Sequence, residues 1–314
     1  MKTTAKCPSG AGSDGSGLTP DDGPGLVDRF SSRQTVHGVD PEDGFAYQLD
    51  PAVPYIATAI HAGSRMRQEL EPLMAISSQA RGLEEDTATD RMIRGLPSAI
   101  WGLDSRAEYD LNRPAERAIP LTPEGFWGLQ VYKRRPNAAM IQKSLAKYHA
   151  FYRFVERWIK RLLDRYGFCL VYDLHAYNIR RQRHQGIDDP PVFNLGTALL
   201  DRRRWHAAIE GWLKELGAIR LPDHAVTVAE NRVFKGHGEF CRRLTAWDPR
   251  ILVLPTEISK IFMDEASGQV HTPVVAALAE GIQRAVGRHS RRCLNESTAS
   301  DARRPPSVRR SPMD

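Results

Sequence analysis

Residues 168–178 read FCLVYDLHAYN, and the rest of the chain is organised around them. The first five residues are apolar, with β-branched and aromatic members, and they follow a glycine that ends a long helical pattern. This pattern predicts a buried central strand. Asp173 and His175 come at the carboxyl end of that strand, where ligands bind in open α/β sheets. Either both polar groups are hydrogen-bonded locally, or the imidazole ligates a metal and the carboxylate supports it.

Two further apolar runs also end in a titratable residue that could bind a metal or transfer a proton. Residues 54–60 (PYIATAI) predict a strand that leads into His61, and the small residues after it allow the backbone to turn close to a ligand. Residues 251–258 (ILVLPTEI) predict a strand with Glu257 near its end. Because strand ends of one sheet converge in space, we expect these groups and His175 to share a site.

Strand patterns alternate with helical patterns along the chain. Apolar residues at helical spacing predict a long amphipathic helix over residues 137–166, which Gly167 ends. The other predicted strands cover residues 99–103, 192–197 and 225–229, and the other main helices cover residues 204–216 and 272–285. This alternation predicts an α/β fold with a mixed, mostly parallel central sheet flanked by helices.

Composition divides the chain of 314 residues into three parts. Residues 1–45 are rich in Gly, Ser, Asp and Pro, and we expect a disordered N-terminal segment. Residues 46–287 are long enough to bury a sizeable core, and we expect them to form a single catalytic domain. Residues 288–314 are rich in arginine and poor in large apolar side chains, which predicts a disordered basic tail.

Charge, hydropathy and cysteine content exclude several classes of protein. The formal net charge of +6 comes largely from the arginines of residues 284–310, which favours a solvated tail over nucleic-acid binding. No apolar run approaches the ~20 residues of a membrane span, and the N-terminus lacks the apolar segment of a secretory signal. Four scattered cysteines favour reduced thiols. We therefore expect a cytoplasmic protein without a membrane or nucleic-acid partner.

Three polar segments lie between the predicted strands and helices. Residues 83–87 (LEEDT) hold three acids, which suit a helix start but also allow one acid to face the two histidines. Residues 105–113 (SRAEYDLNR) form either a surface ion-pair loop or an anion site, since guanidinium forks suit carboxylates. Residues 230–238 (ENRVFKGHG) are a polar, glycine-rich loop of the kind that closes over a ligand.

Together these residue types match the parts of a hydrolytic zinc site. Two imidazoles and a carboxylate, with one open position, are a ligand set of such sites, and the metal lowers the pKa of bound water to about 7. Glu257 would take the proton of that water, an arginine would stabilise the oxyanion, and Asp173 would orient a ligand. Each residue alone also has a structural explanation; Glu257, for example, could pair with Lys260.

Seven short motifs occur in a fixed order, and together they resemble the N-formylglutamate amidohydrolase family. The motifs are Ala59-Ile60-His61-Ala62-Gly63, Glu85-Asp86, Ser105-Arg106 with Asp110-Leu111-Asn112-Arg113, Asp173-Leu174-His175-Ala176-Tyr177-Asn178, Asn194-Leu195-Gly196-Thr197, Glu230-Asn231 with Phe234-Lys235-Gly236, and Glu257-Ile258 with Phe262-Met263-Asp264-Glu265. The resemblance covers roughly residues 45–285. The ordered set is far more specific than any one of its pieces.

The resemblance implies a fold like that of zinc carboxypeptidases and aspartoacylases. It also implies metal-dependent hydrolysis of the amide bond of an N-acyl amino acid or short peptide. His61 and His175 are carried over as ligands of one divalent ion, Zn²⁺, and Glu257 as the general base. The implied partner is therefore a small acylated amino acid or peptide substrate.

The same resemblance implies how the substrate is held. The Asp-Leu-Asn-Arg motif is similar to the aspartoacylase motif that grips the substrate carboxylate, which implies Asn112 and Arg113 in that role. Arg106 is then left for the oxyanion. We also expect Asn231 and His237 to contact the substrate, because both lie in the glycine-rich loop of residues 230–238.

The sequence departs from the related zinc carboxypeptidases at the third metal ligand. Those enzymes place a glutamate shortly after the first histidine, as H-x-x-E, whereas Ala-Gly-Ser follows His61 here. The third ligand must therefore come from elsewhere in the chain. We choose Asp86, with Glu85 and Glu69 as its rivals.

Departures from the family pattern keep a second hypothesis open. His237 stands where many relatives have glycine, and Lys260 stands where arginine is frequent. Together with Ser64 after the first histidine motif, these residues allow a catalytically silent relative that binds a small carboxylate ligand or a protein partner. They bear on the identity of the substrate more than on the chemistry.

Overall fold

The computed structural model describes residues 35–40 and 42–302. The disorder predicted for residues 1–34 and 303–314 lies outside the described residues. Within the described part, eight strands form one sheet. The strands are β1 (Val36–Asp40), β2 (Phe45–Leu49), β3 (Tyr55–Ala59), β4 (Ala99–Gly102), β5 (Cys169–Tyr177), β6 (Phe193–Leu195), β7 (Val228–Glu230) and β8 (Ile251–Ser259).

The strand order is β1-β2-β4-β3-β5-β8-β6-β7, which places β5 in the middle of the sheet. The central strands β4, β3, β5 and β8 are parallel to one another. Antiparallel pairs join β2 to β4, β1 to β2 and β6 to β8, while β7 is parallel to β6. The predicted mixed, mostly parallel sheet is therefore confirmed, as are the flanking helices.

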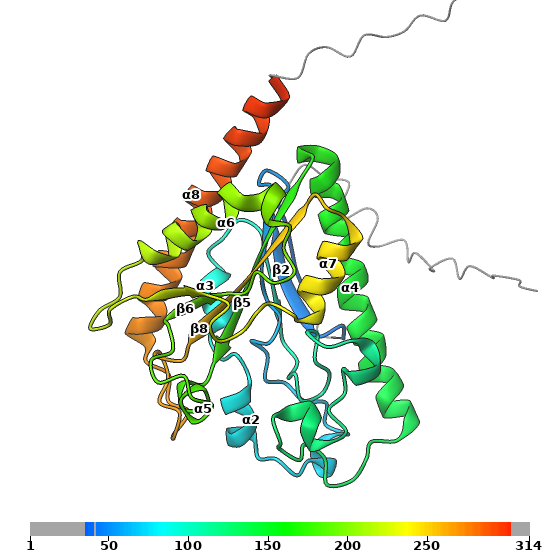
Figure 1. Ribbon diagram of the computed structural model, residues 1–314. Coiled ribbons are helices and arrows are strands. Elements are labelled where there is room, and N and C mark those ends of the chain that lie inside the picture. The colour runs from blue at the N-terminus through cyan, green and yellow to red at the C-terminus, as the bar shows by residue number, and fades with distance from the viewer. Residues whose placement is uncertain (1–34, 41, 303–314) are drawn as a thin grey trace, which may run out of the picture. The chain divides into compact units, whose positions relative to one another are not determined.

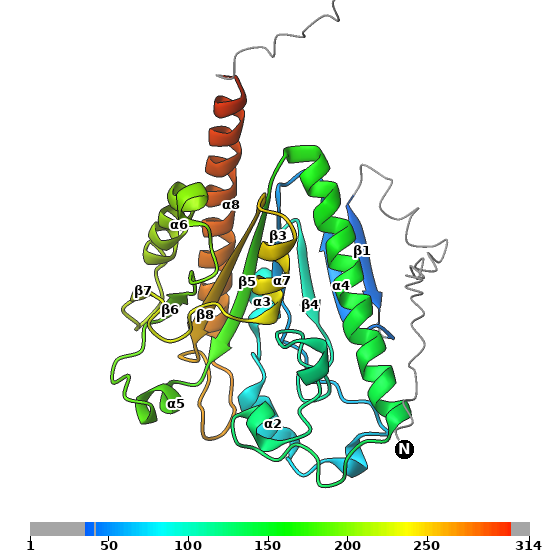
Figure 2. The same cartoon turned by 45° about the vertical axis from the view of Figure 1, so that its right-hand side comes forward.

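Helices cover both faces of this sheet (Figure 1). α4 and α7 lie over one face, and α3, α6 and α8 lie over the other, as the turned view also shows (Figure 2). No helix among the described residues is long and apolar enough to cross a membrane. The helices are α2 (Ser78–Glu84), α3 (Thr89–Ile93), α4 (Ala138–Tyr166), α5 (Ile179–His184), α6 (Arg202–Gly217), α7 (Glu239–Trp247) and α8 (Thr272–Ala302), with short 3₁₀ turns η1 (Glu71–Leu73), η2 (Ala115–Arg117) and η3 (Pro123–Phe126).

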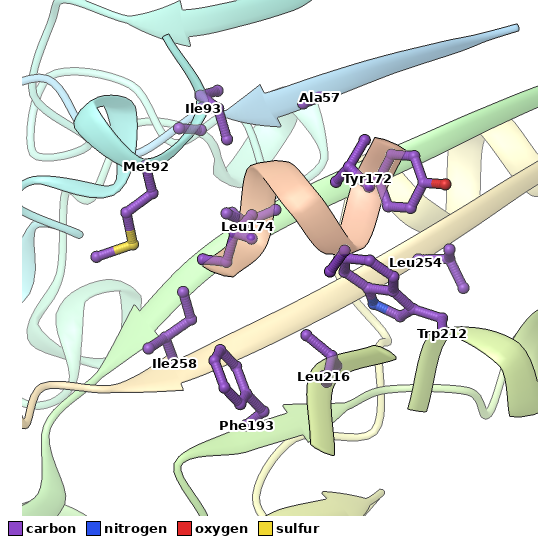
Figure 3. Close-up of a cluster of buried hydrophobic side chains, with 14 of the residues drawn as sticks. Ala57, Met92, Ile93, Tyr172, Leu174, Phe193, Trp212, Leu216, Leu254 and Ile258 are labelled. Carbon is purple, nitrogen blue, oxygen red and sulfur yellow. The ribbon is translucent and has the colours of Figure 1, made fainter. Parts of the chain in front are cut away.

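Alternation along β5 divides its side chains between the two faces of the sheet. Tyr172 and Leu174 pack into the larger apolar core, next to Trp212 of α6 (Figure 3). Asp173 and His175 point to the opposite face, on which α7 lies. The strand predicted to be central and buried therefore carries its apolar and its polar groups on different faces.

The long helix α4 begins and ends as its sequence predicts. Asn137 is its N-cap, and the side chain of this residue accepts a hydrogen bond of 3.0 Å from Met140 N. Gly167 ends the helix in the left-handed conformation, with φ of 73°. One face of the helix is buried and includes Phe151, Val155 and Trp158. The helix thus covers one face of the sheet with its aromatic stripe.

The N-terminal part of the fold begins earlier than predicted. β1 (Val36–Asp40) and the first residue of β2, Phe45, lie within the segment of residues 1–45 that we predicted to be disordered. β1 pairs with β2 at the edge of the sheet. The glycine-rich composition of the whole segment hid this short strand, in which Val36 and Val39 are the only large apolar residues of the five.

The C-terminal part extends further than predicted. α8 continues to Ala302, although the domain was predicted to end at residue 287 and a disordered tail to follow. His289 is fully buried and accepts a hydrogen bond of 2.7 Å from the Tyr172 hydroxyl, while Cys293 is also buried. These contacts hold an arginine-rich helix against the central strand, which charge counting alone does not reveal.

Candidate metal centre

The carboxyl ends of three parallel strands bring the predicted site residues together. His61 follows β3, and His175 lies on β5 directly opposite Glu257 of β8 in the strand register. Asp86 comes from the segment after α2, where its backbone N–H donates to His61 O at 3.0 Å. The backbone of the acidic segment is thus fastened to the first histidine.

His61, Asp86 and His175 form a compact cluster whose potential ligand atoms all lie within 4.8 Å of one another. Asp86 Oδ2 lies 3.0 Å from His175 Nδ1 and 3.4 Å from His61 Nδ1. None of the three residues is more than 3% exposed. The Nδ1 atoms of both imidazoles therefore face the same carboxylate at a buried position.

The other ring nitrogen of each histidine is held by a second carboxylate. His61 Nε2 donates to Asp110 Oδ1 at 2.8 Å, and His175 Nε2 donates to Asp173 Oδ2 at 2.9 Å. Asp173 is fixed in turn by the hydroxyl of Thr58, which donates to its other oxygen at 2.7 Å. Such partners set the orientation and tautomer of a metal-ligating histidine.

Two atoms of the cluster lack a hydrogen bond within the described part of the chain and could instead bind a divalent cation. Among the described residues, His61 Nδ1 and Asp86 Oδ1 are buried side-chain atoms without a hydrogen-bond partner. A buried polar atom without a partner costs about 1–3 kcal/mol. Both atoms belong to residues of the His-His-Asp set, and nitrogen and carboxylate oxygen are ligands that Zn²⁺ accepts.

The two rivals of Asp86 are engaged elsewhere. Glu85 Oε1 accepts hydrogen bonds from the Ser105 hydroxyl at 2.5 Å and from Arg81 Nε at 3.0 Å. Glu69 accepts from Arg67 Nη1 at 2.5 Å and lies at the surface. Of the three acids that we considered, the structure therefore brings Asp86 to the histidines.

Charge within the cluster favours a bound cation. Burial opposes charge on Asp86, but the hydrogen bond from His175, together with the nearby His61 and Arg106, holds the pKa of this carboxyl below its usual range. Burial likewise opposes charge on His175, but the neighbouring Asp173 carboxylate raises the pKa of the imidazole well above its usual value. In the absence of a metal, a proton on His175 is thus favoured by the neighbouring carboxylates. A bound cation would neutralise the same carboxylates.

The acquisition of a metal is expected to release protons. Because the Asp173 carboxylate raises the pKa of His175 well above its usual value, we expect zinc to displace a proton from this imidazole, so the apparent zinc affinity should rise by up to about tenfold per pH unit between pH 6 and 8. Competition with a chromogenic chelator at several pH values measures this slope. The other buried histidine, His289, should not add to this pH dependence, because burial lowers its pKa to about 4. A flat affinity over this range would contradict the expectation.

Glu257 has the properties of a proton acceptor. Burial raises the pKa of its carboxyl to about 7, while the nearby His175 acts in the opposite direction. The carboxyl lines the same cavity as the cluster, and no hydrogen bond or ion pair engages it within the part of the chain that the structure describes. The ion pair with Lys260 that we considered does not form, because that ammonium group donates to backbone carbonyls.

Arg106 and Arg113 flank the cluster and share one carboxylate. Arg106 Nη2 donates to Asp110 Oδ2 at 2.7 Å, and Arg113 Nε lies 3.4 Å from the same oxygen. The guanidinium of Arg106 also lies 3.8 Å from Asp86 Oδ1 and stacks over the Trp127 ring at 4.4 Å. Asp110 therefore positions a histidine and both arginines at once.

These groups surround a cavity of about 450 Å³. The wall includes all three members of the cluster together with Glu257, Arg106, Asn112, Arg113, Trp127, His237 and Gly238. Asn231, which we expected to contact the substrate, is not in the wall; its side chain binds Thr197, through Oδ1 to the backbone N–H and through Nδ2 to the hydroxyl, each at 2.8 Å. The asparagine thus braces the loop that carries His237.

Lys260 fastens the segment that carries Asp86. It is only 2% exposed, and its Nζ donates to Leu83 O at 2.6 Å and to Glu85 O at 2.8 Å. Burial lowers the pKa of this ammonium group to about 8. The same strand end therefore supplies both Glu257 and the group that holds the loop before Asp86.

Replacing Lys260 by methionine is expected to weaken zinc binding about tenfold, because the loop that orients Asp86 loses two hydrogen bonds. The free energy of unfolding of the metal-free protein should change less, since relief of the buried charge offsets part of the loss. Chelator competition and chemical denaturation measure the two quantities. Lys160→Met, at an exposed lysine of α4, is the matched control. An unchanged zinc affinity would show that the loop holds Asp86 without Lys260.

Asp110, Trp127 and Lys260 are the parts of the site that sequence reasoning missed. Asp110 stood inside a quoted motif, but its position in the middle of a polar loop gave no sign of a role. Trp127 lies in a left-handed turn with φ of 52°, in a segment without a recognisable pattern. All three roles depend on tertiary contacts that no spacing encodes.

The candidate site is thus a His-His-Asp cluster at the carboxyl ends of parallel strands in a mixed α/β sheet. The model of the N-formylglutamate amidohydrolase family matches residues 53–263, which is most of the chain. The chain belongs to this family. No curated protein matches the chain significantly in sequence.

Two solved structures with TM-scores above 0.5 support the fold. The N-formylglutamate amidohydrolase from Ralstonia eutropha JMP134 aligns with a TM-score of 0.62 and 17% identity over 82% of this chain and 99% of its own. A gene product from Agrobacterium tumefaciens aligns with a TM-score of 0.55 and 16% identity over 86% and 97%. A metallo-carboxypeptidase from Burkholderia cenocepacia aligns with a TM-score of 0.38 and 14% identity over 85% and 68%.

Proposed function

We propose that the protein is a zinc-dependent amidohydrolase that cleaves the amide bond of an N-acyl amino acid or short peptide. His61, Asp86 and His175 would hold the ion. The observation that carries the proposal is a pair of buried atoms without a hydrogen bond to any described residue, His61 Nδ1 and Asp86 Oδ1. They lie in a cavity that the carboxylate of Glu257 also lines.

The proton transfers fall to Glu257. When bound, the metal would polarise the scissile carbonyl and lower the pKa of the attacking water. The Glu257 carboxylate takes a proton from that water and delivers it to the leaving nitrogen as the C–N bond breaks. A pKa of about 7, raised by burial, makes this carboxyl a strong enough base to accept the proton near neutral pH.

The arginines account for substrate charge. Arg106 is fixed by Asp110 and by the Trp127 ring, so its guanidinium is preorganised for the oxyanion that develops on the carbonyl oxygen. Arg113 is about a third exposed and faces the cavity next to Asn112, where it can bind the carboxylate of the amino-acid part. His237 lies in the wall of the same cavity and would contact the substrate there.

The surroundings of this reaction are part of the proposal. We place it in the cytoplasm, where the buried thiols of Cys169, Cys241 and Cys293 stay reduced. The substrate is a small molecule, and we expect neither a membrane nor a nucleic acid as a partner.

Metal analysis and hydrolysis assays test the proposal together. The protein as purified should contain about one zinc per chain, and it should release glutamate from N-formyl-L-glutamate or another N-acyl amino acid. Chelation should abolish the release, and stoichiometric zinc should restore it. A protein that binds zinc and a carboxylate ligand but turns over no member of such a panel would instead be the catalytically silent relative that His237 and Lys260 left open.

A further inference from the structure

A second cavity, of about 580 Å³, lies beside the candidate metal centre along α5. Trp127 lines both cavities, and a small space of about 30 Å³ between them is lined by Arg106 from the first and by Asn178 and Arg181 from the second. α2 and α5 lie beyond the carboxyl end of β5, at the end of the sheet where the metal centre is built (Figure 2). The second cavity therefore adjoins the site, with Trp127 and the small space between the two.

Asn178 lines this second cavity, and its side-chain oxygen has no hydrogen-bond partner among the described residues. It is the N-cap residue of α5, a position where asparagine ordinarily accepts from the helix backbone, but its side chain makes no capping bond. The carboxylate of Glu265 does this instead, since it accepts from the backbone N–H groups of Ile179 and Arg180. Asn178 Oδ1 is left buried without a partner in the described part of the chain, where the side chain lines both the second cavity and the connecting space.

The direction of the substrate follows from the proposed roles of the arginines. Arg113 and His237 line the first cavity but neither the connecting space nor the second cavity. A substrate whose amino-acid carboxylate is bound by Arg113 therefore extends its acyl group past Arg106 and Trp127. The space on that side is much larger than a formyl group requires.

We propose that the second cavity is an acyl subsite for an acyl group that carries its own amide, as in an N-acyl dipeptide, with Asn178 paired to that amide. The inference rests on the proposed amidohydrolase function and narrows its substrate class. A carboxamide offers both an acceptor and a donor, so it complements the N–H and C=O of a peptide group. The enzyme would then add water to the carbonyl next to the carboxy-terminal residue, break that C–N bond, and release an N-acyl amino acid and a free amino acid.

The other polar groups of the cavity disfavour the alternative acyl classes. Arg181 is held at both terminal nitrogens by Glu84, at 2.8 and 2.6 Å, and stacks over Trp127 at 5.2 Å, so its charge is already balanced. The Glu265 carboxylate also lines the cavity and would repel an anionic acyl group, while the other basic residues of the wall, Arg180 and His184, are exposed to solvent. A purely aliphatic acyl chain would leave Asn178 buried without a partner, which costs about 1–3 kcal/mol.

Binding measurements test the subsite apart from catalysis. The zinc-loaded Glu257→Gln protein is titrated calorimetrically with N-formyl-L-glutamate and with N-acetyl-L-alanyl-L-glutamate. The dipeptide should bind about tenfold more tightly, and Asn178→Ala in the same background should remove that advantage while leaving N-formyl-L-glutamate within about twofold, as expected for one or two hydrogen bonds. Arg183→Ala, at an exposed residue of α5 outside the cavity walls, is the control and should change neither affinity.

Turnover by the wild-type protein supplies the second measurement. Release of glutamate from N-acetyl-L-alanyl-L-glutamate should show a kcat/KM about tenfold higher than release from N-(O-acetyl-L-lactyl)-L-glutamate, in which an ester oxygen replaces the amide N–H. Asn178→Ala should lose activity on the dipeptide and bring the two substrates to within about twofold.

The possible results separate the two proposals. Equal binding of N-formyl-L-glutamate and the dipeptide, or an equal loss of both in Asn178→Ala, overturns the subsite and leaves the amidohydrolase function standing. Tighter binding of the dipeptide without turnover of any substrate supports the subsite and overturns the hydrolase. Preference for the dipeptide in both measurements, lost in Asn178→Ala alone, supports the assignment.

Discussion

Replacing Glu257 by glutamine is expected to lower kcat/KM for any hydrolysed N-acyl amino acid by about 10²–10⁴-fold, the usual contribution of a general base. The amide has nearly the same shape but does not accept a proton from water. Zinc affinity should fall by less than about tenfold, because Glu257 lies outside the His61, Asp86 and His175 cluster. Steady-state kinetics together with chelator competition separates the two quantities.

The same substitution should leave a signature in stability. Burial raises the pKa of Glu257 to about 7, so the metal-free folded protein loses free energy when this carboxyl ionises above its unfolded-state pKa. Glu257→Gln should therefore raise the free energy of unfolding of metal-free protein at pH 8. The gain should vanish below about pH 4.5, where the carboxyl is protonated in both states.

Glu280→Gln, at an exposed residue of α8, is the matched control and should alter neither kinetics nor stability measurably. Substantial hydrolysis by Glu257→Gln would transfer the base to another group. A loss of zinc affinity that parallels the loss of rate would show instead that the substitution disturbs the metal centre and not the proton transfer.

The convergence of the site could be predicted because it follows from the sheet. His175 and Glu257 stand at the carboxyl ends of apolar runs, and parallel strands bring such ends to one edge. The choice among neighbouring acids was less certain from sequence, since residues 84–86 are all acidic. Glu85 and Asp86 are neighbours in the sequence, and their side chains point in different directions. Only the packed structure shows that Ser105 and Arg81 engage Glu85.

The remaining parts of the site depend on contacts between distant segments. Trp127 separates two cavities because guanidinium groups from two other segments, Arg106 and Arg181, stack on its ring. Asn178 is freed from its capping role by Glu265, which lies 86 residues from the amide that it caps. Neither arrangement has a local pattern, and the same holds for the edge strand β1, whose stability comes from its pairing with β2.

Asp110→Asn is expected to separate the two functions that this carboxylate combines. Its Oδ1 accepts from His61 Nε2 and from Asn112 N, and an amide oxygen can keep both bonds. Its Oδ2 accepts from Arg106, where an amide nitrogen would instead face a second donor. The guanidinium of Arg106, which we propose stabilises the oxyanion, should therefore lose its position, and kcat/KM should fall about 10²–10³-fold.

Zinc affinity distinguishes this variant from Asp110→Ala. The asparagine retains the partner of His61, so the affinity should change less than in the alanine variant, for which a loss of about 10–100-fold is expected. Both variants leave a buried guanidinium short of its carboxylate, which should lower the free energy of unfolding by about 3 kcal/mol. Asp164→Asn, at an exposed aspartate of α4, controls for the loss of one negative charge. Wild-type turnover in Asp110→Asn would mean that Arg106 does not act on the oxyanion, since its tightest ion pair would then be dispensable.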